Sequence, residues 1–263
     1  MIMEKQISKQ DPKFQELKGL LQKGNGNLIA TDDLSVLRLA KKYDIRIIDF
    51  FYSNEIEYHI DTKKDIDFFK SKAKNTYILS EKAISCLKRK ENSAGLFAII
   101  DLKLKSLSDL KNIDYLVVCD RLEIPGNIGT IYRTCDSAKV GGLILVDPIT
   151  KANNPSLVSS SRGCNLLIPT VEASYNDTLN YLEENGYTIF LGEPNLGKDY
   201  QKYDYNGKVA IVVGNERFGI NPDWYNHKHE KVFIPMYGSN NSLNVSVACS
   251  ILIYEASMKK FNK

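Results

Sequence analysis

The second half of the chain alternates short, unbroken apolar segments with segments of helical periodicity. A strand that is apolar at every position is buried on both faces, so helices must cover both sides of a largely parallel sheet. This pattern predicts an α/β fold. The predicted strands are 115–119, 143–146, 166–171, 188–191, 209–213 and 232–236, and the predicted helices are 125–136, 176–186 and 244–260.

The first part of the chain repeats this alternation on a smaller scale. Helices are predicted over 11–23, 34–43, 65–73 and 81–90, and strands over 45–53, 76–79 and 96–100. The stretch 102–112 has neither pattern, and 263 residues suit one large domain or two modest ones. We therefore expect a small α/β domain over 1–105, a linker over 106–111 and a second domain over 112–263.

Charge is distributed unevenly between these two parts. Residues 1–110 contain 20 Lys and Arg against 16 Asp and Glu, a balance of +4, whereas residues 111–263 contain 15 against 16, a balance of −1. The basic clusters at 70–74 and at Lys88-Arg89-Lys90 indicate either a solvated lysine-rich face or a weak phosphate-binding surface. The net charge of +3 excludes a strongly basic chromatin-type binder.

The cysteines and histidines argue against a disulfide framework and against a metal site. Five cysteines are scattered along the chain without a CxxC pair, and His227 and His229 have no cysteine or carboxylate at ligand spacing. Reduced thiols are typical of a cytoplasmic protein. No apolar run approaches the roughly 18–20 residues that span a bilayer, so we expect neither a metal nor a membrane partner.

Three loops that follow predicted strands carry polar residues and glycines. They are 125–129, with Arg133 one helical turn further on, 214–219 and 234–246. Ligands of open α/β sheets bind beyond the carboxyl ends of the strands. Neither GxGxxG nor GxxxxGK[ST] is present, which disfavours a nucleotide-dependent oxidoreductase and a phosphate-loop enzyme. Each loop alone predicts only a turn; together they predict one site.

The three loops and their flanking strands resemble the SpoU (TrmH-type) family of the SPOUT methyltransferases. The matching segments, 125–147, 209–220 and 232–256, occur in the family's order and at its spacing, and SSSRG at 159–163 also fits. The first part is similar, more loosely, to the ribosomal-protein-like substrate-binding domain of many such enzymes. It reads Ile29-Ala30-Thr31-Asp32 where the family often has Glu-Gly.

The resemblance implies a parallel sheet whose C-terminal segment forms a trefoil knot. It also implies a homodimer that transfers a methyl group from S-adenosylmethionine to a ribose 2′-hydroxyl of RNA. The additional domain favours ribosomal RNA, with 23S ribosomal RNA as the expected target. A tRNA methyltransferase and a non-catalytic RNA-binding protein on the same fold stay open as alternatives.

The family's motif positions carry over to three sets of residues. The catalytic set is Asn127, Arg133, Glu216 and Asn244. The cofactor-binding set is Leu191, Gly192, Gly214, Asn215, Ile234, Pro235, Met236, Ser242, Leu243 and Asn244. The RNA-binding set is Arg133, Arg162, Lys88, Arg89 and Lys90. A guanidinium has no free acceptor, so an electrostatic clamp suits Arg133 better than a general base. Arg217 stands where the family also has small or other polar residues, and the expectation for it is an additional phosphate contact.

Overall fold

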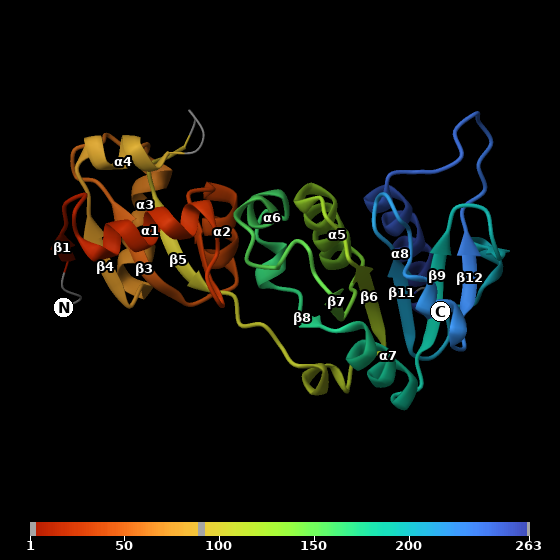
Figure 1. Cartoon of the computed structure of the whole chain (residues 1–263). Helices are drawn as coiled ribbons and strands as arrows, with labels where there is room; N and C mark the ends of the chain where they lie inside the picture. Colours follow the sequence, from red (N-terminus) through yellow and green to blue (C-terminus); the bar gives the residue numbers. More distant parts are fainter. Residues whose placement is uncertain (1–3, 89–92, 262–263) are drawn as a thin grey trace. The chain divides into compact units, whose positions relative to one another are not determined.

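A computed structural model describes residues 4–88 and 93–261 and divides the chain into two compact units (Figure 1). The first unit comprises residues 1–103 together with 153–166, and the second comprises 104–152 and 167–263. The segment 153–166, which the sequence analysis assigns to the second domain, therefore packs within the first unit. Among the described residues, no helix combines the length and the apolar character that a bilayer crossing requires.

The first unit is built on a five-stranded mixed sheet in the order β1-β4-β3-β5-β2. The strands are β1 (Glu4–Gln6), β2 (Leu28–Thr31), β3 (Ile47–Tyr52), β4 (Asn75–Ile78) and β5 (Phe97–Asp101). The helices are α1 (Pro12–Gln22), α2 (Leu34–Lys42), α3 (Ile60–Lys72), α4 (Glu81–Leu87) and, from later in the chain, α6 (Pro155–Ser160). Sequence patterning did not predict β1, whose three residues are polar and exposed, or β2, which has only four residues and ends in Thr31.

Helix α6 packs against β2 and α1 of the first unit. The Asn153 side chain donates to the Gly26 carbonyl at 2.8 Å, and the Ser159 hydroxyl donates to Asp33 at 3.2 Å. Gly24 is required at this contact, because a Cβ there would lie 2.3 Å from the Asn153 carbonyl oxygen. These contacts, rather than chain order, assign 153–166 to the first unit.

The second unit is a seven-stranded, all-parallel sheet in the order β10-β12-β9-β11-β6-β7-β8. Its strands are β6 (Tyr115–Asp120), β7 (Gly142–Val146), β8 (Thr170–Ala173), β9 (Thr188–Glu193), β10 (Lys198–Asp199), β11 (Val209–Val213) and β12 (Glu230–Phe233). Its α-helices are α5 (Pro125–Ser137), α7 (Tyr175–Glu184) and α8 (Val245–Phe261), and its 3-10 turns are η1 (Leu107–Leu110), η3 (Tyr200–Lys202) and η4 (Pro222–Asn226). A short turn that belongs to the first unit, η2 (Cys164–Leu166), precedes β8.

Helices cover both faces of this sheet, as the apolar strands require. On one face, Leu116 and Val118 of β6 belong to a buried cluster with Leu182 of α7 and Trp224 of η4. Alternation along the strand directs Tyr115 to the opposite face, where its hydroxyl donates to the Ile253 carbonyl of α8 at 2.8 Å. Helices α5 and α8 lie side by side (Figure 1).

Two strand predictions need correction at their ends. Strand β12 ends at Phe233, whereas the apolar run predicted a strand through Met236, so residues 234–236 belong to a loop. Strand β8 begins at Thr170, and the apolar residues before it form η2 and a turn instead. An apolar run predicts that side chains pack against other residues, and a half-buried loop can meet that requirement as well as a strand does.

We expect Gly24→Ala to destabilise the first unit by about 1–3 kcal/mol, because the added methyl overlaps the Asn153 backbone. The control is Gly19→Ala in α1, where a Cβ meets nothing within 4 Å and alanine favours the helix by about 1 kcal/mol. Urea unfolding measures both variants. Equal stability of the two would contradict the packing of 153–166 against this unit.

Candidate active site

Loops at the carboxyl ends of four neighbouring strands, β6, β9, β11 and β12, enclose a pocket of about 580 Å³. The segment between β12 and α8, blue in Figure 1, extends beyond the strand ends. The lining residues come from these loops and from the start of α8. They are Ile124, Asn127, Gly192, Glu193, Pro194, Asn195, Val213, Gly214, Asn215, Glu216, Arg217, Gly219, Ile220, Val232, Ile234, Met236, Asn241, Ser242, Leu243, Asn244, Val245, Ala248 and Leu252.

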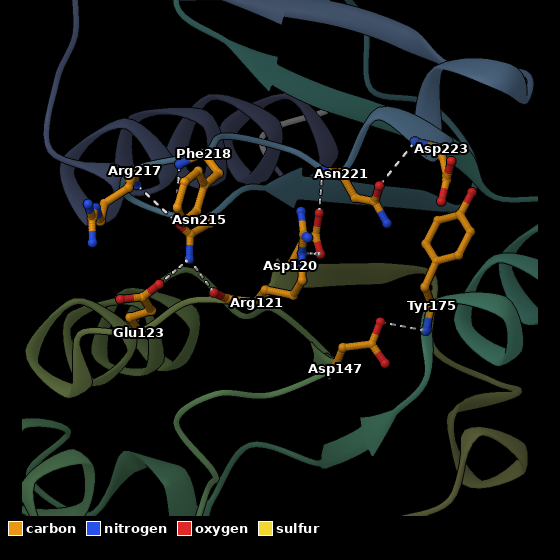
Figure 2. A network of polar contacts seen from close by, with 10 residues as sticks. All are labelled: Asp120, Arg121, Glu123, Asp147, Tyr175, Asn215, Arg217, Phe218, Asn221 and Asp223. Atoms are coloured by element: carbon orange, nitrogen blue, oxygen red, sulfur yellow. Dashed lines mark hydrogen bonds and ion pairs between the residues drawn. The ribbon is translucent and has the colours of Figure 1, made fainter.

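The loop after β11 is held by the buried side chain of Asn215, which is 5% exposed. Its amide nitrogen donates to the Arg121 carbonyl at 2.7 Å and to Glu123 at 3.1 Å, and its oxygen accepts from the backbone N–H groups of Arg217 and Phe218 (Figure 2). All four hydrogen-bonding positions of the amide are used. Asn215 therefore fixes the turn that follows it and ties that turn to the loop after β6.

Gly214 and Asp120 reinforce the same junction. A Cβ at Gly214 would lie 2.2 Å from the backbone of Gly219 and Ile220, so only glycine allows the turn to close so tightly. The fully buried Asp120 accepts from the Asn221 N–H at 2.6 Å and from the Arg121 side chain (Figure 2). Burial raises the pKa of Asp120 above its ordinary range, although these hydrogen bonds oppose the shift.

Three of the four predicted catalytic residues meet in one chain of hydrogen bonds. The Asn127 side chain, 8% exposed, donates to Glu216 at 2.8 Å and accepts from the Asn244 amide at 3.1 Å. Asn244 also accepts from the Ser246 N–H at 2.9 Å, next to the first turn of α8. The Asn127 amide is thus held in one orientation between an acceptor and a donor.

Glu216 accepts two further hydrogen bonds, from the backbone N–H groups of Glu123 at 3.0 Å and Ile124 at 3.1 Å. Burial alone would raise the pKa of Glu216, but the hydrogen bonds from Glu123, Asn127 and Ile124 outweigh it, and the pKa lies below its ordinary value. The ionised carboxylate therefore joins the loops after β6 and β11. Its lone pairs are engaged, which suits positioning better than proton transfer.

The predicted cofactor residues divide into a lining set and a supporting set. Eight of them line the pocket: Gly192, Gly214, Asn215, Ile234, Met236, Ser242, Leu243 and Asn244. Leu191 is fully buried in the core beneath the site, and neither it nor Pro235 is among the lining residues. The apolar wall of Ile234, Met236 and Leu243 is available because β12 ends at Phe233.

Arg133 does not line the pocket, unlike the other predicted catalytic residues. It lies six residues beyond Asn127 on α5, which is about 9 Å further along the helix axis. Its side chain is exposed, and its guanidinium contacts no carboxylate of the described residues. This places a free cation outside the pocket.

The predicted RNA-binding residues of the first unit are exposed where they are described. Arg162 is exposed in a turn at φ 51°, and Lys88 is exposed just after α4. Arg89 and Lys90 lie outside the described residues. Of the other basic cluster, Lys70 pairs with Glu4 at 2.6 Å and Lys72 pairs with Asp44 at 2.8 Å, which partly neutralises it.

Sequence reasoning found Gly192 near the end of β9 but missed the three residues after it that also line the pocket. Glu193, Pro194 and Asn195 line it, and Glu193 accepts a hydrogen bond from the Tyr225 hydroxyl. The rule that ligands lie at the carboxyl ends of parallel strands could have found them, because they directly follow the apolar segment 188–191. Ile124 and Arg217 also line the mouth of the pocket.

Comparison with known proteins identifies the family to which this chain belongs. The model of the SpoU rRNA Methylase family matches residues 114–254, which is more than half of the chain. The chain therefore belongs to the SpoU rRNA Methylase family.

Particular relatives match over different lengths. A 23S rRNA (guanosine(2553)-2′-O)-methyltransferase, RlmP of Bacillus subtilis, is 29% identical over 68% of this chain and 71% of its own length. An AdoMet-bound rRNA methyltransferase of Sinorhizobium meliloti shares the fold at a TM-score of 0.85, with 24% identity over 98% of both chains. A TrmH/SpoU tRNA modifying enzyme of A. aeolicus covers only 59% of this chain, with 25% identity and a TM-score of 0.51.

Replacing Glu216 by glutamine should lower stability at pH 7 by about 2 kcal/mol, because charge-assisted hydrogen bonds to two backbone N–H groups are weakened. The lowered pKa means that this stabilisation is fully present above the ordinary glutamate pKa of about 4.3 and disappears as the pH falls through the lower folded-state value. Urea unfolding should show that the difference in free energy of unfolding between Glu216→Gln and the parent becomes smaller toward pH 3. The exposed Glu184, changed to Gln, serves as the control. A difference in free energy of unfolding that does not depend on pH would refute the role of the charge.

Proposed function

We propose that this chain transfers a methyl group from S-adenosylmethionine to a ribose 2′-hydroxyl of RNA. The observation that carries the proposal is the hydrogen-bonded set Asn127, Glu216 and Asn244 on one wall of the pocket, in a member of the SpoU family. The B. subtilis 23S rRNA methyltransferase is similar to this chain in sequence, and the S. meliloti rRNA methyltransferase is similar to it in fold.

The residues of the pocket suit S-adenosylmethionine, which supplies an electrophilic methyl group on a positively charged sulfur. A volume of about 580 Å³ lies within the usual range for such ligands. The apolar side chains of Ile234, Met236 and Leu243 provide a slot for an adenine, and the carboxylates of Glu193 and Glu216 favour a cation. Gly192 allows α8 to pack closely beneath the pocket, since a Cβ there would lie 3.2 Å from Leu252.

The polar residues of the chain orient the RNA. Glu216 positions the Asn127 amide, and Asn244 holds it from the other side, so that Asn127 presents a fixed dipole to the ribose. Arg133 acts outside the pocket as an electrostatic contact to the RNA backbone. It is no proton acceptor, because a guanidinium stays protonated and has no lone pair to offer.

Ribosomal RNA, with 23S ribosomal RNA as the specific target, is the substrate we propose. The S. meliloti rRNA methyltransferase matches both units, whereas the A. aeolicus tRNA modifying enzyme covers 59% of the chain. The first unit then serves RNA binding, through Lys88, Arg162 and the neighbouring Arg89-Lys90. We place the protein in the cytoplasm, where RNA substrates are found and cysteines stay reduced. The trefoil knot stays a prediction.

The homodimer that we propose uses α8. Its inner face is buried, yet Val247, Tyr254, Met258 and Phe261 are each 45–56% exposed on its outer face. Spacings of seven, four and three residues place them along one stripe of the helix. An exposed apolar stripe on an otherwise buried helix favours association with a second copy.

The direct test of the function is incubation of the protein with labelled S-adenosylmethionine and unmodified RNA, followed by mapping of 2′-O-methyl positions. Methylation of a discrete ribose in 23S ribosomal RNA is the expected result. Methylation of tRNA alone would identify the tRNA alternative. Binding of RNA without any detectable binding of the cofactor would identify the non-catalytic alternative.

Arg133→Ala should lower the rate of methyl transfer by roughly 10²-fold, because the RNA backbone loses the contact that positions its ribose for the transfer. Cofactor affinity should change less than twofold, since Arg133 is not among the lining residues of the pocket. Calorimetric titration and single-turnover kinetics separate the two effects. Arg133→Lys keeps the charge but not the bidentate geometry, and it should recover part of the rate. Full activity of the alanine variant would remove Arg133 from the site.

Met258→Arg should convert the dimer to a monomer, because it places a charge in the apolar stripe. Light scattering should report a mass that is halved relative to the parent. The matched control is Ile149→Arg, the same change at a side chain that is 59% exposed and outside α8. A Met258→Arg protein that stays dimeric would exclude this face of α8.

A further inference from the structure

The turn that carries Glu216 also presents an exposed aromatic ring beside an unpaired cation. Phe218 is 73% exposed, and the Arg217 guanidinium lies 5.5 Å from its ring centroid. Arg217 lines the mouth of the pocket, and so does Ile124, which is 51% exposed. Within residues 4–88 and 93–261, Arg217 forms no ion pair.

This ring is held on a rigid turn. The backbone N–H groups of Arg217 and Phe218 both donate to the buried Asn215 oxygen, at 2.9 and 3.1 Å (Figure 2). Asn215 and Gly219 exchange two backbone hydrogen bonds across the turn, at 3.0 and 2.9 Å. The fixed backbone reduces the entropy that a ligand must remove when it docks on the ring.

Resting on the proposed function, we propose that Arg217 and Phe218 form a platform for a nucleobase of the single-stranded RNA segment that carries the target ribose. Flat aromatic faces and arginine guanidinium planes are what unpaired bases stack on. The base stacks on the Phe218 ring, and the Arg217 guanidinium contacts the adjoining phosphate.

The position of the platform suits this substrate. Glu216, which holds Asn127, and Arg217 both line the pocket, and Phe218 is the next residue in the chain, so the platform adjoins the pocket. A base on the platform therefore brings its own ribose, or that of a neighbouring nucleotide, toward the pocket. The platform contacts the flat face of a base and not its hydrogen-bonding edge. It therefore prefers unpaired RNA to duplex RNA and does not distinguish one base from another.

The test uses the full-length protein and a single-stranded 12-nucleotide RNA that contains 2-aminopurine, a base whose fluorescence reports stacking. Phe218→Ala should weaken binding roughly 5- to 100-fold, the range that corresponds to loss of one stacked base. It should also abolish the fluorescence change. Phe218→Trp should retain both, and the matching duplex should bind the parent and Phe218→Ala equally. Arg217→Gln should reduce the slope of log affinity against log salt by about 0.7.

Three controls make the proposal falsifiable. Melting temperature and cofactor affinity of Phe218→Ala should match the parent, because the ring is exposed. Ile149→Ala, a comparably exposed apolar change outside the pocket, should leave RNA affinity unchanged. RNA binding by Phe218→Ala within twofold of the parent, or an equal loss in Ile149→Ala, would overturn the platform. Dissociation of the Phe218→Ala protein to monomers would assign the ring to a protein interface and also overturn it.

Failure of the platform and failure of the proposed function give different results. If no RNA is methylated but Phe218→Ala loses oligonucleotide binding, the platform stands and the enzyme activity does not. If RNA is methylated and Phe218→Ala methylates it with unchanged KM and kcat, the activity stands and the platform does not.

Discussion

The geometry of the pocket depends on the hydrogen bonds that the Glu216 carboxylate accepts. Two of its three partners are backbone N–H groups of the loop after β6, and the third is the side-chain amide of Asn127 at the start of α5. One ionised group therefore fixes both the path of that loop and the orientation of a side chain. Two loops that follow non-consecutive strands, β6 and β11, are joined by it. Each hydrogen bond to a charged group contributes about 1.5–3 kcal/mol, which is enough to hold short loops against their conformational entropy.

Asn215 and Glu216 are neighbours in the chain, and their side chains hold different parts of the pocket. The Asn215 side chain points toward Arg121 and Glu123 and uses all its polar capacity on the protein, while the next residue turns toward Asn127. The sequence analysis assigns Asn215 to the cofactor because of the family's motif. The contacts suit a residue that shapes the pocket and lines it without a free hydrogen-bonding group on its side chain. A motif position therefore identifies a residue that matters and leaves open whether it contacts a ligand or supports one that does.

Patterning predicted most of the second unit because its central strands β6, β7 and β11 are apolar at nearly every position. Segments such as 209–213 are buried along their whole length, and a run of that kind has few alternatives in an α/β chain. The same rule misplaced the end of β12, since Ile234 and Met236 are apolar for a different reason, as walls of the pocket. It also placed 153–166 with the second domain. Nothing local in that segment reveals that Gly24, far away in the sequence, leaves space for Asn153.

Helix α8 contributes to the pocket, to the core and to the outer surface of the second unit. Near its N-terminus Asn244 contacts Asn127, along its inner face it packs on β9 and β11, and the Ser250 hydroxyl bonds Thr134 of α5 at 2.8 Å. Its outer stripe is the surface proposed for a second copy. A helix is stiff along its axis, so a displacement caused by association at the stripe would also move the residues that hold Asn127. The proposed association at the stripe and the orientation of the Asn127 amide would therefore be coupled through one rigid element.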